Sequence, residues 1–336
     1  MSAAAGGRPG LGRLLGRVKF DRYLALIILM VVAASLAPAR GPAAVGFDWA
    51  TRIAIGLVFF LHGARLSRES VIAGIAHWRL HLVVLASTFV LFPLLCLGLA
   101  ALPAAITPPA LASGIIFLGC LPSTIQSSIG FTVIGRGDVP AAVAAASASN
   151  LLGMFLTPLL VSLLLHAQSG ISAGQVWAIV LQLLAPFVAG QALHRWLGPW
   201  VKQKAKTLSY VDRGSILLVV YTAFSGAVVE GVWSRVGAAD LVRLVALCCL
   251  LLAAVLAATA WAARTFGFSK PDEIAIVFCG SKKSLASGAP MAGVLFPAAS
   301  AGVALLPLMI FHQIQLMVCA VIAQRYARRV EADPPL

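Results

Sequence analysis

The sequence predicts an all-α polytopic membrane protein with ten transmembrane helices. Its composition, its length and the distribution of its basic residues all lead to this class. Of the 336 residues, 60% are hydrophobic and only 11% are charged, and the mean hydropathy is +0.97. Soluble globular proteins carry about 25% charged residues, which excludes a soluble two-domain enzyme. A membrane-spanning helix needs roughly 20 apolar residues, so this length accommodates on the order of ten spans with their loops.

Ten apolar segments follow one another, at residues 22–38, 50–64, 80–102, 110–135, 139–166, 174–194, 210–230, 239–263, 271–296 and 299–324. If the connecting loops alternate between the two sides, 19 of the 25 Lys and Arg residues lie on one side and four on the other. Basic residues concentrate in cytoplasmic loops. We therefore expect a location in the cell (inner) membrane, with the basic N-terminus 1–21 and the tail 325–336 in the cytoplasm. The loops near 104–108 and 167–173 are expected outside.

The same bias explains the formal net charge of +14. The basic residues face the cytoplasm because of membrane insertion, so the expected partner is the lipid bilayer and not a nucleic acid. The six cysteines all fall in apolar stretches without metal-ligand spacing, and a free buried cysteine commonly behaves as a small apolar residue. We expect no cofactor apart from a coupling ion.

The fourth and ninth segments are interrupted by polar residues. Residues 110–135 leave the apolar pattern at PSTIQSS, and residues 271–296 leave it at GSKKSLAS. The two interruptions are about 160 residues apart, close to half the chain, and interrupted helices at corresponding positions of two halves point to a transporter binding site. Each half then has five spans, so the second half is inverted. We predict a five-plus-five inverted repeat, 22–166 and 167–324, whose broken helices four and nine cross.

A broken helix exposes groups that can bind ions. Its internal N-terminus carries a partial positive charge and its internal C-terminus a partial negative one, so two breaks offer N–H groups to an anion and carbonyls to a cation. The fifth segment adds a polar helical face with Ser147, Asn150, Met154 and Thr157. The Asn150 amide oxygen suits a hard cation such as sodium, whereas Thr157 suits an interhelical hydrogen bond. His62 and His312 are expected to pack between helices.

Lys282 and Lys283 are the most unusual residues of the ninth segment. A lysine at the centre of a membrane helix costs roughly 2.5–3.5 kcal/mol on insertion scales, so ionisable residues there indicate function. The eleven residues from Pro271 to Lys282 correspond to roughly 16 Å of helix, which is mid-membrane. Successive helical residues point about 100° apart. We expect one of the two lysines to face the helix crossing and the other to face the substrate cleft.

Two long motifs carry a family resemblance, LPSTIQSSIGFTVIGRGDVPAAVAAASASNLLGMFLTPLL and PDEIAIVFCGSKKSLASGAPMA. They resemble the bile acid:sodium symporter superfamily, in the bacterial branch related to the seventh member of human solute carrier family 10. The resemblance covers about residues 18–326. It implies a six-helix core domain and a four-helix panel domain, with the substrate in the cleft between them and sodium behind the crossing.

The resemblance also implies site residues. Sodium ligands would lie at Gln126, Ser127, Ser128, Ser147, Asn150 and Ser281. We assign substrate or coupling contacts to the break residues Thr124, Lys282, Lys283, Ser284 and Ser287. The bile acid branch has a glutamate and a glutamine at the second break, and these positions fall on Phe278 and Lys282 here. If the residues after Gly280 are helical, the resemblance implies that Lys282 substitutes for a coupling cation at the crossing and that Lys283 faces the cleft and an anionic substrate.

We therefore expect a secondary transporter of an organic, anionic solute that works by alternating access. The coupling ion is sodium, or a lysine ammonium takes the place of one ion. Two alternatives stay open: a carrier coupled to protons through a lysine, and a membrane regulator of ion homeostasis that moves no solute. An intramembrane enzyme is not expected, because no nucleophile–histidine–carboxylate set is present. The sequence leaves the solute and the oligomeric state open.

Overall fold

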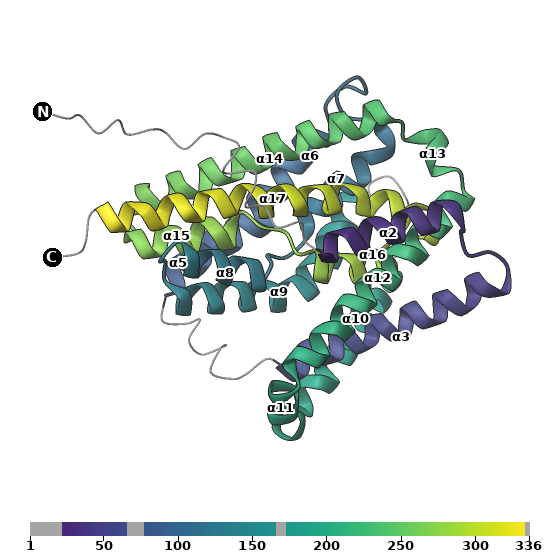
Figure 1. The fold of residues 1–336 in the computed structure, drawn as a ribbon, viewed down its shortest axis with the longest axis horizontal. Coiled ribbons are helices and arrows are strands. Elements are labelled where there is room, and N and C mark those ends of the chain that lie inside the picture. Colours follow the sequence, from purple (N-terminus) through teal and green to yellow (C-terminus); the bar gives the residue numbers. More distant parts are fainter. Residues whose placement is uncertain (1–21, 66–76, 166–172, 333–336) are drawn as a thin grey trace, which may run out of the picture.

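The computed structural model describes residues 22–65, 77–165 and 173–332, and every regular element in these ranges is a helix (Figure 1). Within them, six stretches are long and apolar enough to cross a membrane: 42–65, 78–100, 139–165, 205–229, 238–265 and 299–329. Shorter apolar helices lie at 25–36, 109–120 and 181–192. The protein is thus all-helical with several candidate membrane spans, while ten crossings and the inverted repeat stay predictions.

The first half contains α2 (Arg22–Leu36), α3 (Pro42–Arg65), α5 (Trp78–Ala86), η1 (Ser87–Leu91), α6 (Phe92–Ala100), α7 (Pro109–Cys120), α8 (Gln126–Ile134) and α9 (Val139–Leu165). Residues 121–125 leave the helix, where the polar cluster predicts an interruption. Helix α3 begins eight residues before the predicted segment, because Asp48 and Arg52 on its exposed side lower the local hydropathy.

The second half contains α10 (Ala173–Ala192), α11 (His194–Gln203), α12 (Ala205–Val229), α13 (Val232–Arg235), α14 (Ala238–Thr265), α15 (Lys270–Gly280), α16 (Leu285–Leu295) and α17 (Ala298–Ala332). Residues 281–284 separate α15 from α16. Helix α17 extends past the predicted end at residue 324. Helix α11 was not expected, because it alternates the exposed rings of Trp196 and Trp200 with charged residues and forms no apolar run. The predicted N-terminus 1–21 and nearly all of the predicted loop 167–173 lie outside the described residues.

Helices α3 and α10 approach each other unusually closely. Both have glycine at the contact: a Cβ atom at Gly63 would lie 2.0 Å from the carbonyl oxygen of Phe187, and one at Gly190 would lie 2.0 Å from that of Phe60. Figure 1 shows the two helices side by side with α11 at the bottom of the view, and α12 contacts α2, α3, α16 and α17. Helix α12 therefore links α2 and α3 to the rest of the bundle.

The third predicted span contains one π-helical turn, η1. The N–H of Phe92 donates to the carbonyl of Ser87, five residues earlier, where an α-helix would direct it to Thr88. The residue five positions after Thr88 is Pro93, which has no N–H to donate. The Thr88 carbonyl is thereby left without a donor from its own helix.

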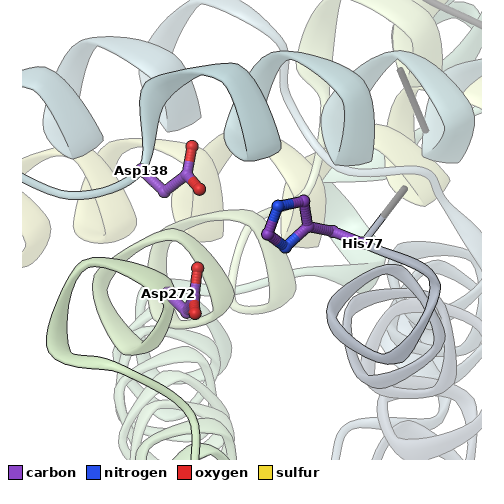
Figure 2. A group of neighbouring side chains, drawn as sticks. All are labelled: His77, Asp138 and Asp272. Atoms are coloured by element: carbon purple, nitrogen blue, oxygen red, sulfur yellow. The ribbon is translucent and has the colours of Figure 1, made fainter. Parts of the chain in front are cut away.

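Helices α5, α9 and α15 begin close together, and acidic residues lie at two of these starts. The ligand atoms of His77, Asp138 and Asp272 lie within 4.8 Å of one another, and Figure 2 shows the three side chains facing a common point. Asp138 accepts the N–H of Ala141 at 2.9 Å, and Asp272 accepts the Ser269 hydroxyl at 2.7 Å. Both carboxylates are thus used at helix N-termini, where negative charge is stabilising.

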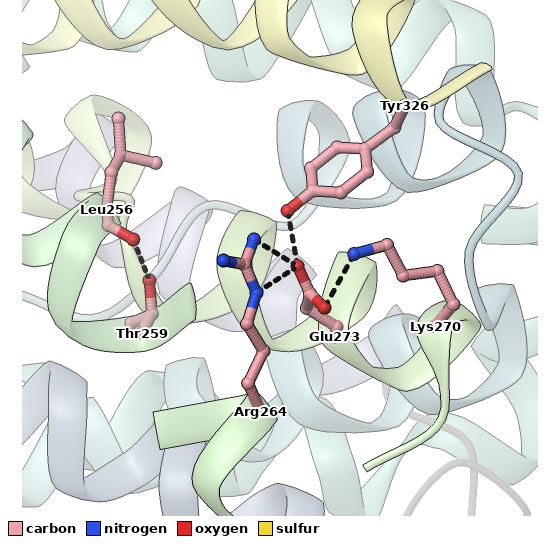
Figure 3. Close-up of polar contacts among 6 residues, drawn as sticks. All are labelled: Leu256, Thr259, Arg264, Lys270, Glu273 and Tyr326. Atoms are coloured by element: carbon pink, nitrogen blue, oxygen red, sulfur yellow. Dashed lines mark hydrogen bonds and ion pairs between the residues drawn. The ribbon is translucent and has the colours of Figure 1, made fainter. Parts of the chain in front are cut away.

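A buried carboxylate joins α14, α15 and α17 at the same end of the bundle (Figure 3). Glu273 is 4% exposed and accepts from Arg264 at 3.1 Å, Lys270 at 2.7 Å and the Tyr326 hydroxyl at 2.9 Å. A buried charge is tolerated when it is paired and hydrogen-bonded in this way. Glu273 therefore anchors the start of α15 against its two neighbours.

Candidate functional site

The two helix breaks contact each other directly. The N–H of Ser284 donates to the Pro122 carbonyl at 2.9 Å, and the hydroxyl of Ser123 donates to the Cys279 carbonyl at 2.6 Å. Residues about 160 positions apart in the sequence thus complete each other's main-chain hydrogen bonds. Non-helical backbone at membrane depth is tolerated only where protein or a water-filled cavity covers it, and here each break covers the other.

Helix α9 satisfies the main chain of the first break. Thr157 donates to the Cys120 carbonyl at 2.8 Å, which confirms its interpretation as an interhelical hydrogen-bond donor. The Ser123 N–H donates to the Ser149 hydroxyl at 3.0 Å, and the Asn150 amide donates to the Ser123 carbonyl at 2.6 Å. The polar face predicted for this helix therefore holds the break in position.

Helix α17 satisfies the second break through a residue that the sequence analysis missed. Gln315, fully buried, accepts the N–H of Lys283 at 2.9 Å and donates to the carbonyl of Lys283 at 2.9 Å. His312 lies one turn away, with its Nδ1 3.2 Å from the same carbonyl. A glutamine one turn from a histidine inside a long apolar run was the available signal. His312 is therefore more than the packing residue that was expected.

A cavity of about 560 Å³ lies beside the two breaks. One wall comes from the breaks and from α8, α9, α16 and α17, and the other from α2, α3, α10 and α12. Seven of the predicted site residues line it: Thr124, Gln126, Ser127, Ser147, Asn150, Ser284 and Ser287. His62, expected as a packing residue, also lines it.

Asn150 connects both breaks at the cavity wall. Its amide nitrogen binds the first break, and its amide oxygen accepts the Ser287 hydroxyl of α16 at 2.8 Å. Thr124 is hydrogen-bonded to Ser127 and lies 3.2 Å from the Ser128 hydroxyl. The structure thus brings these polar side chains together, while their role as ion ligands stays a prediction.

The remaining four predicted residues do not line the cavity. Ser128, Ser281, Lys282 and Lys283 are all fully buried. The Ser281 hydroxyl donates back to the Val277 carbonyl of its own helix at 2.6 Å. Only seven of the eleven predicted side chains are therefore within reach of a solute in this cavity.

The orientation expected for Lys283 was wrong, while the role expected for Lys282 stays a prediction. Lys283 does not face the cleft: its Nζ donates to the carbonyls of Thr88, Gly119 and Leu121 at 2.8, 2.7 and 2.7 Å. The Lys282 Nζ lies 4.4 Å from the Phe131 ring centroid and, within the described residues, has no hydrogen-bond partner. The expectation assumed helical geometry after Gly280, whereas residues 281–284 are not helical.

The electrostatic character of the cavity comes mainly from helix ends. The first turns of α8 and α16 both line it, and a helix N-terminus carries a partial positive charge. Farther along the cavity, Arg65 pairs with Asp212 at 2.5 Å, and Arg213 lies next to that pair in the sequence. The lining therefore combines two helix N-termini, one Arg–Asp ion pair and a further arginine.

Comparison with known proteins agrees with this architecture. Residues 21–328 match the SBF-like CPA transporter family. The chain belongs to this family. The resemblance to the bile acid:sodium symporter superfamily is thereby confirmed, and the chain is a transmembrane protein of a transporter family.

Several relatives cover nearly the whole chain. It is 58% identical to the Pseudomonas aeruginosa protein "Uncharacterized protein PA2026" (92% of this chain, 93% of the relative). It is 53% identical to "Putative symporter YfeH" of Escherichia coli K12 (93% and 94%). The mouse protein "Sodium/bile acid cotransporter 7" is 27% identical over 92% of this chain and 93% of its own length. The similarity therefore extends over the breaks and the cavity walls.

Proposed function

We propose that the protein is a sodium-coupled secondary transporter of an organic anion that works by alternating access. The observation that carries the proposal is the cavity beside the paired breaks, into which two helix N-termini lead. The volume of about 560 Å³ is that of a small-molecule site, for which several hundred Å³ is typical.

The helix ends favour an anionic cargo. Each N-terminus stabilises a nearby negative charge by about 0.3–1 kcal/mol, and up to about 2 kcal/mol where water is excluded. Thr124, Ser284 and Ser287 stand at these ends and are the proposed polar contacts of the solute. The Ser284 hydroxyl already accepts the Ser287 N–H at 3.1 Å, as a helix cap does. Lys282 and Lys283 are not among the proposed solute contacts, because neither lines the cavity.

The proposal of alternating access rests on the predicted topology. We propose ten crossings, two inverted halves at 22–166 and 167–324, and a division into core and panel domains with the cavity between them. Both termini are cytoplasmic in the cell membrane. The cavity extends to Arg65, Ala205 and Arg213, at helix ends that this topology places on the cytoplasmic side. The described state is then inward-open.

The proposed sodium ligands are Gln126, Ser127, Ser128, Ser147, Asn150 and Ser281. Support comes from their oxygen chemistry, which hard cations prefer, and from the word sodium in the names of several relatives. Two of these oxygens, the hydroxyls of Ser127 and Ser128, pair with the Thr124 hydroxyl in this structure. An entering ion would replace hydroxyl–hydroxyl contacts with ion–oxygen contacts.

Uptake into proteoliposomes tests the proposal. Purified protein is reconstituted, and a panel of organic anions is offered with an inward sodium gradient and with the same salt on both sides. We expect at least one anion to accumulate only with the gradient. Uptake that ignores the gradient would contradict sodium coupling, and no uptake across the panel would favour the non-transporting regulator.

Site variants locate the function in the cavity. Asn150→Ala and Ser287→Ala remove the link between the breaks, and we expect each to lower sodium-driven uptake at least tenfold with expression kept. Ser225→Ala is the matched control, because the buried Ser225 hydroxyl has no hydrogen-bond partner among the described residues and lies outside the cavity lining. Equal uptake by all three variants and the parent would remove these residues from the site.

A further inference from the structure

The ammonium group of Lys283 is enclosed by main-chain carbonyl oxygens. Its Nζ donates to Thr88, Gly119 and Leu121, all at 2.7–2.8 Å, and lies 4.1 Å from the centroid of the Phe92 ring. The side chain is 0% exposed. Three oxygens and an aromatic face are the surroundings in which proteins hold a desolvated cation.

The number of hydrogen bonds indicates that the group is an ammonium ion. A charged lysine has three N–H donors, and three carbonyls accept from it here. A neutral amine has two N–H donors and a lone pair, so it would leave one carbonyl unpaired and facing that lone pair. Leaving a buried acceptor unpaired is unfavourable.

The three carbonyls need a cation because the fold removes their usual donors. The Thr88 carbonyl has no donor from its own helix, because the N–H of Phe92 donates to Ser87 in the π turn and Pro93 has no N–H. Gly119 lies in the last turn of α7, where carbonyls have no intrahelical partner, and the N–H that would reach it, that of Ser123, donates to Ser149. Leu121 is in the break itself. The carbonyl cage is thus a property of the main chain, and Lys283 fills it.

We propose that these carbonyls form a monovalent-cation site and that Lys283 is its permanently attached cation. The site is separate from the proposed sodium ligands, because none of its three oxygens belongs to those residues and Lys283 does not line the cavity. A protein without this lysine would need a dissolved monovalent cation at the same place. The inference goes beyond the proposed function and does not depend on it.

Lys282 provides a matched control in the next position of the chain. It is equally buried, and within the described residues its Nζ makes no hydrogen bond. Lys282→Met therefore removes a charge without exposing a carbonyl, whereas Lys283→Met exposes three. We expect a fall in Tm of roughly 5–10 °C for Lys283→Met in detergent, and an unchanged or higher Tm for Lys282→Met. Equal Tm values for Lys283→Met and the parent would overturn the proposal.

Chemical rescue tests the charge itself. Lys283→Ala removes the atoms that propylammonium contains, so propylammonium chloride should raise the Tm of Lys283→Ala by at least half of its deficit. Sodium, potassium and tetramethylammonium chloride at the same ionic strength show which dissolved cations fit, and 1-propanol tests for filling by apolar atoms alone. Rescue by 1-propanol as strong as that by propylammonium, or no rescue by any of the cations, would overturn the proposal.

The design also covers variants that fail to fold. If Lys283→Ala cannot be purified, it is expressed and extracted in propylammonium chloride beside Lys282→Ala, and the yield of monodisperse protein replaces Tm as the readout. A selective gain for Lys283→Ala supports the cation site, and equal yields with and without propylammonium overturn it. Because this experiment measures folding, its result remains valid even if the protein shows no sodium-driven uptake.

Discussion

Two amide side chains, Asn150 at the cavity wall and the buried Gln315, hold the interrupted helices together. Asn150 donates to Ser123 and Ala146 and accepts from Ser287, and Gln315 donates to and accepts from the main chain of Lys283. An amide has both a carbonyl oxygen and an NH₂ group, so one side chain can pair with a donor and an acceptor simultaneously. A serine or threonine side chain is too short to pair with both the N–H and the carbonyl of one residue in another segment of the chain. The breaks therefore depend on these two residues.

Replacing Gln315 by Met tests this dependence. The variant leaves the buried N–H of Lys283 without its acceptor and removes one of the two partners of its carbonyl, and an unpaired buried group costs roughly 1–3 kcal/mol. We expect a fall in Tm of several degrees in detergent. The control is Gln324→Met, an exposed position on the same helix, which should change Tm by less than about 1 °C. Equal Tm values for the two variants would mean that other groups satisfy the break.

At the scale of residues, the sequence predicted where polar side chains lie better than it predicted which groups they contact. The clusters around Thr124 and Ser284 and the face of Asn150 were predicted, because polar side chains are conspicuous in apolar segments. Gln315 was missed, since one amide in a long apolar helix gives a weak signal. The direction of Lys283 was wrong because side-chain direction after Gly280 depends on a non-helical backbone that no periodicity describes.

At the scale of elements, close helix contact depends on the absence of a side chain. Gly63 of α3 and Gly190 of α10 each leave room for the other helix's main chain. Small residues at such contacts let membrane helices pack by van der Waals forces and weak hydrogen bonds. This contact fixes two of the helices that line the cavity opposite the breaks.

Gly63→Ala should force α3 and α10 apart. The added Cβ would lie 2.0 Å from a main-chain oxygen, so the backbone itself must move. We expect a strong loss of folded protein in detergent, measured by size-exclusion chromatography after heating. Gly56→Ala on the same helix has nothing within 4 Å of the added atom and should behave like the parent. If Gly63→Ala and Gly56→Ala elute alike, the close contact between α3 and α10 does not contribute to the stability of the folded protein.

The sequence located most helices but misjudged three features of them. Both interruptions lie where polar clusters predict them, because Pro, Gly and Ser end apolar helices recognisably. The π turn at Ser87–Leu91 was invisible, because it inserts into an apolar run without changing composition. Helix α11 was hidden by its charges, and the start of α3 by Asp48 and Arg52.

At the scale of the whole molecule, two groups of helices line the cavity. One wall carries the breaks, and the other carries α2, α3, α10 and α12. The charge pattern of the loops predicts which end of this cavity faces the cytoplasm. Orientation is a property of the protein in its membrane, so it has to be measured there.

Cysteine labelling in intact cells tests the orientation. Ala105→Cys lies between α6 and α7 and should react with a membrane-impermeant maleimide added outside. Lys204→Cys lies between α11 and α12 and should react only after the cells are opened. Among the native cysteines, five are buried and Cys249 is exposed on α14, so the parent measures background labelling. The reverse pattern would invert the proposed topology.

In the proposed carrier, the ammonium of Lys283 would determine how membrane voltage acts on the transport cycle. A dissolved cation crosses with the cargo and then leaves, whereas an attached one moves in both directions with the protein. Moving one elementary charge through 100 mV corresponds to about 2.3 kcal/mol. With one sodium ion and a monovalent anion bound, these two charges cancel, and the attached charge stays uncompensated in that step as well. The empty carrier keeps its positive charge, so an inside-negative potential draws it toward the cytoplasmic side.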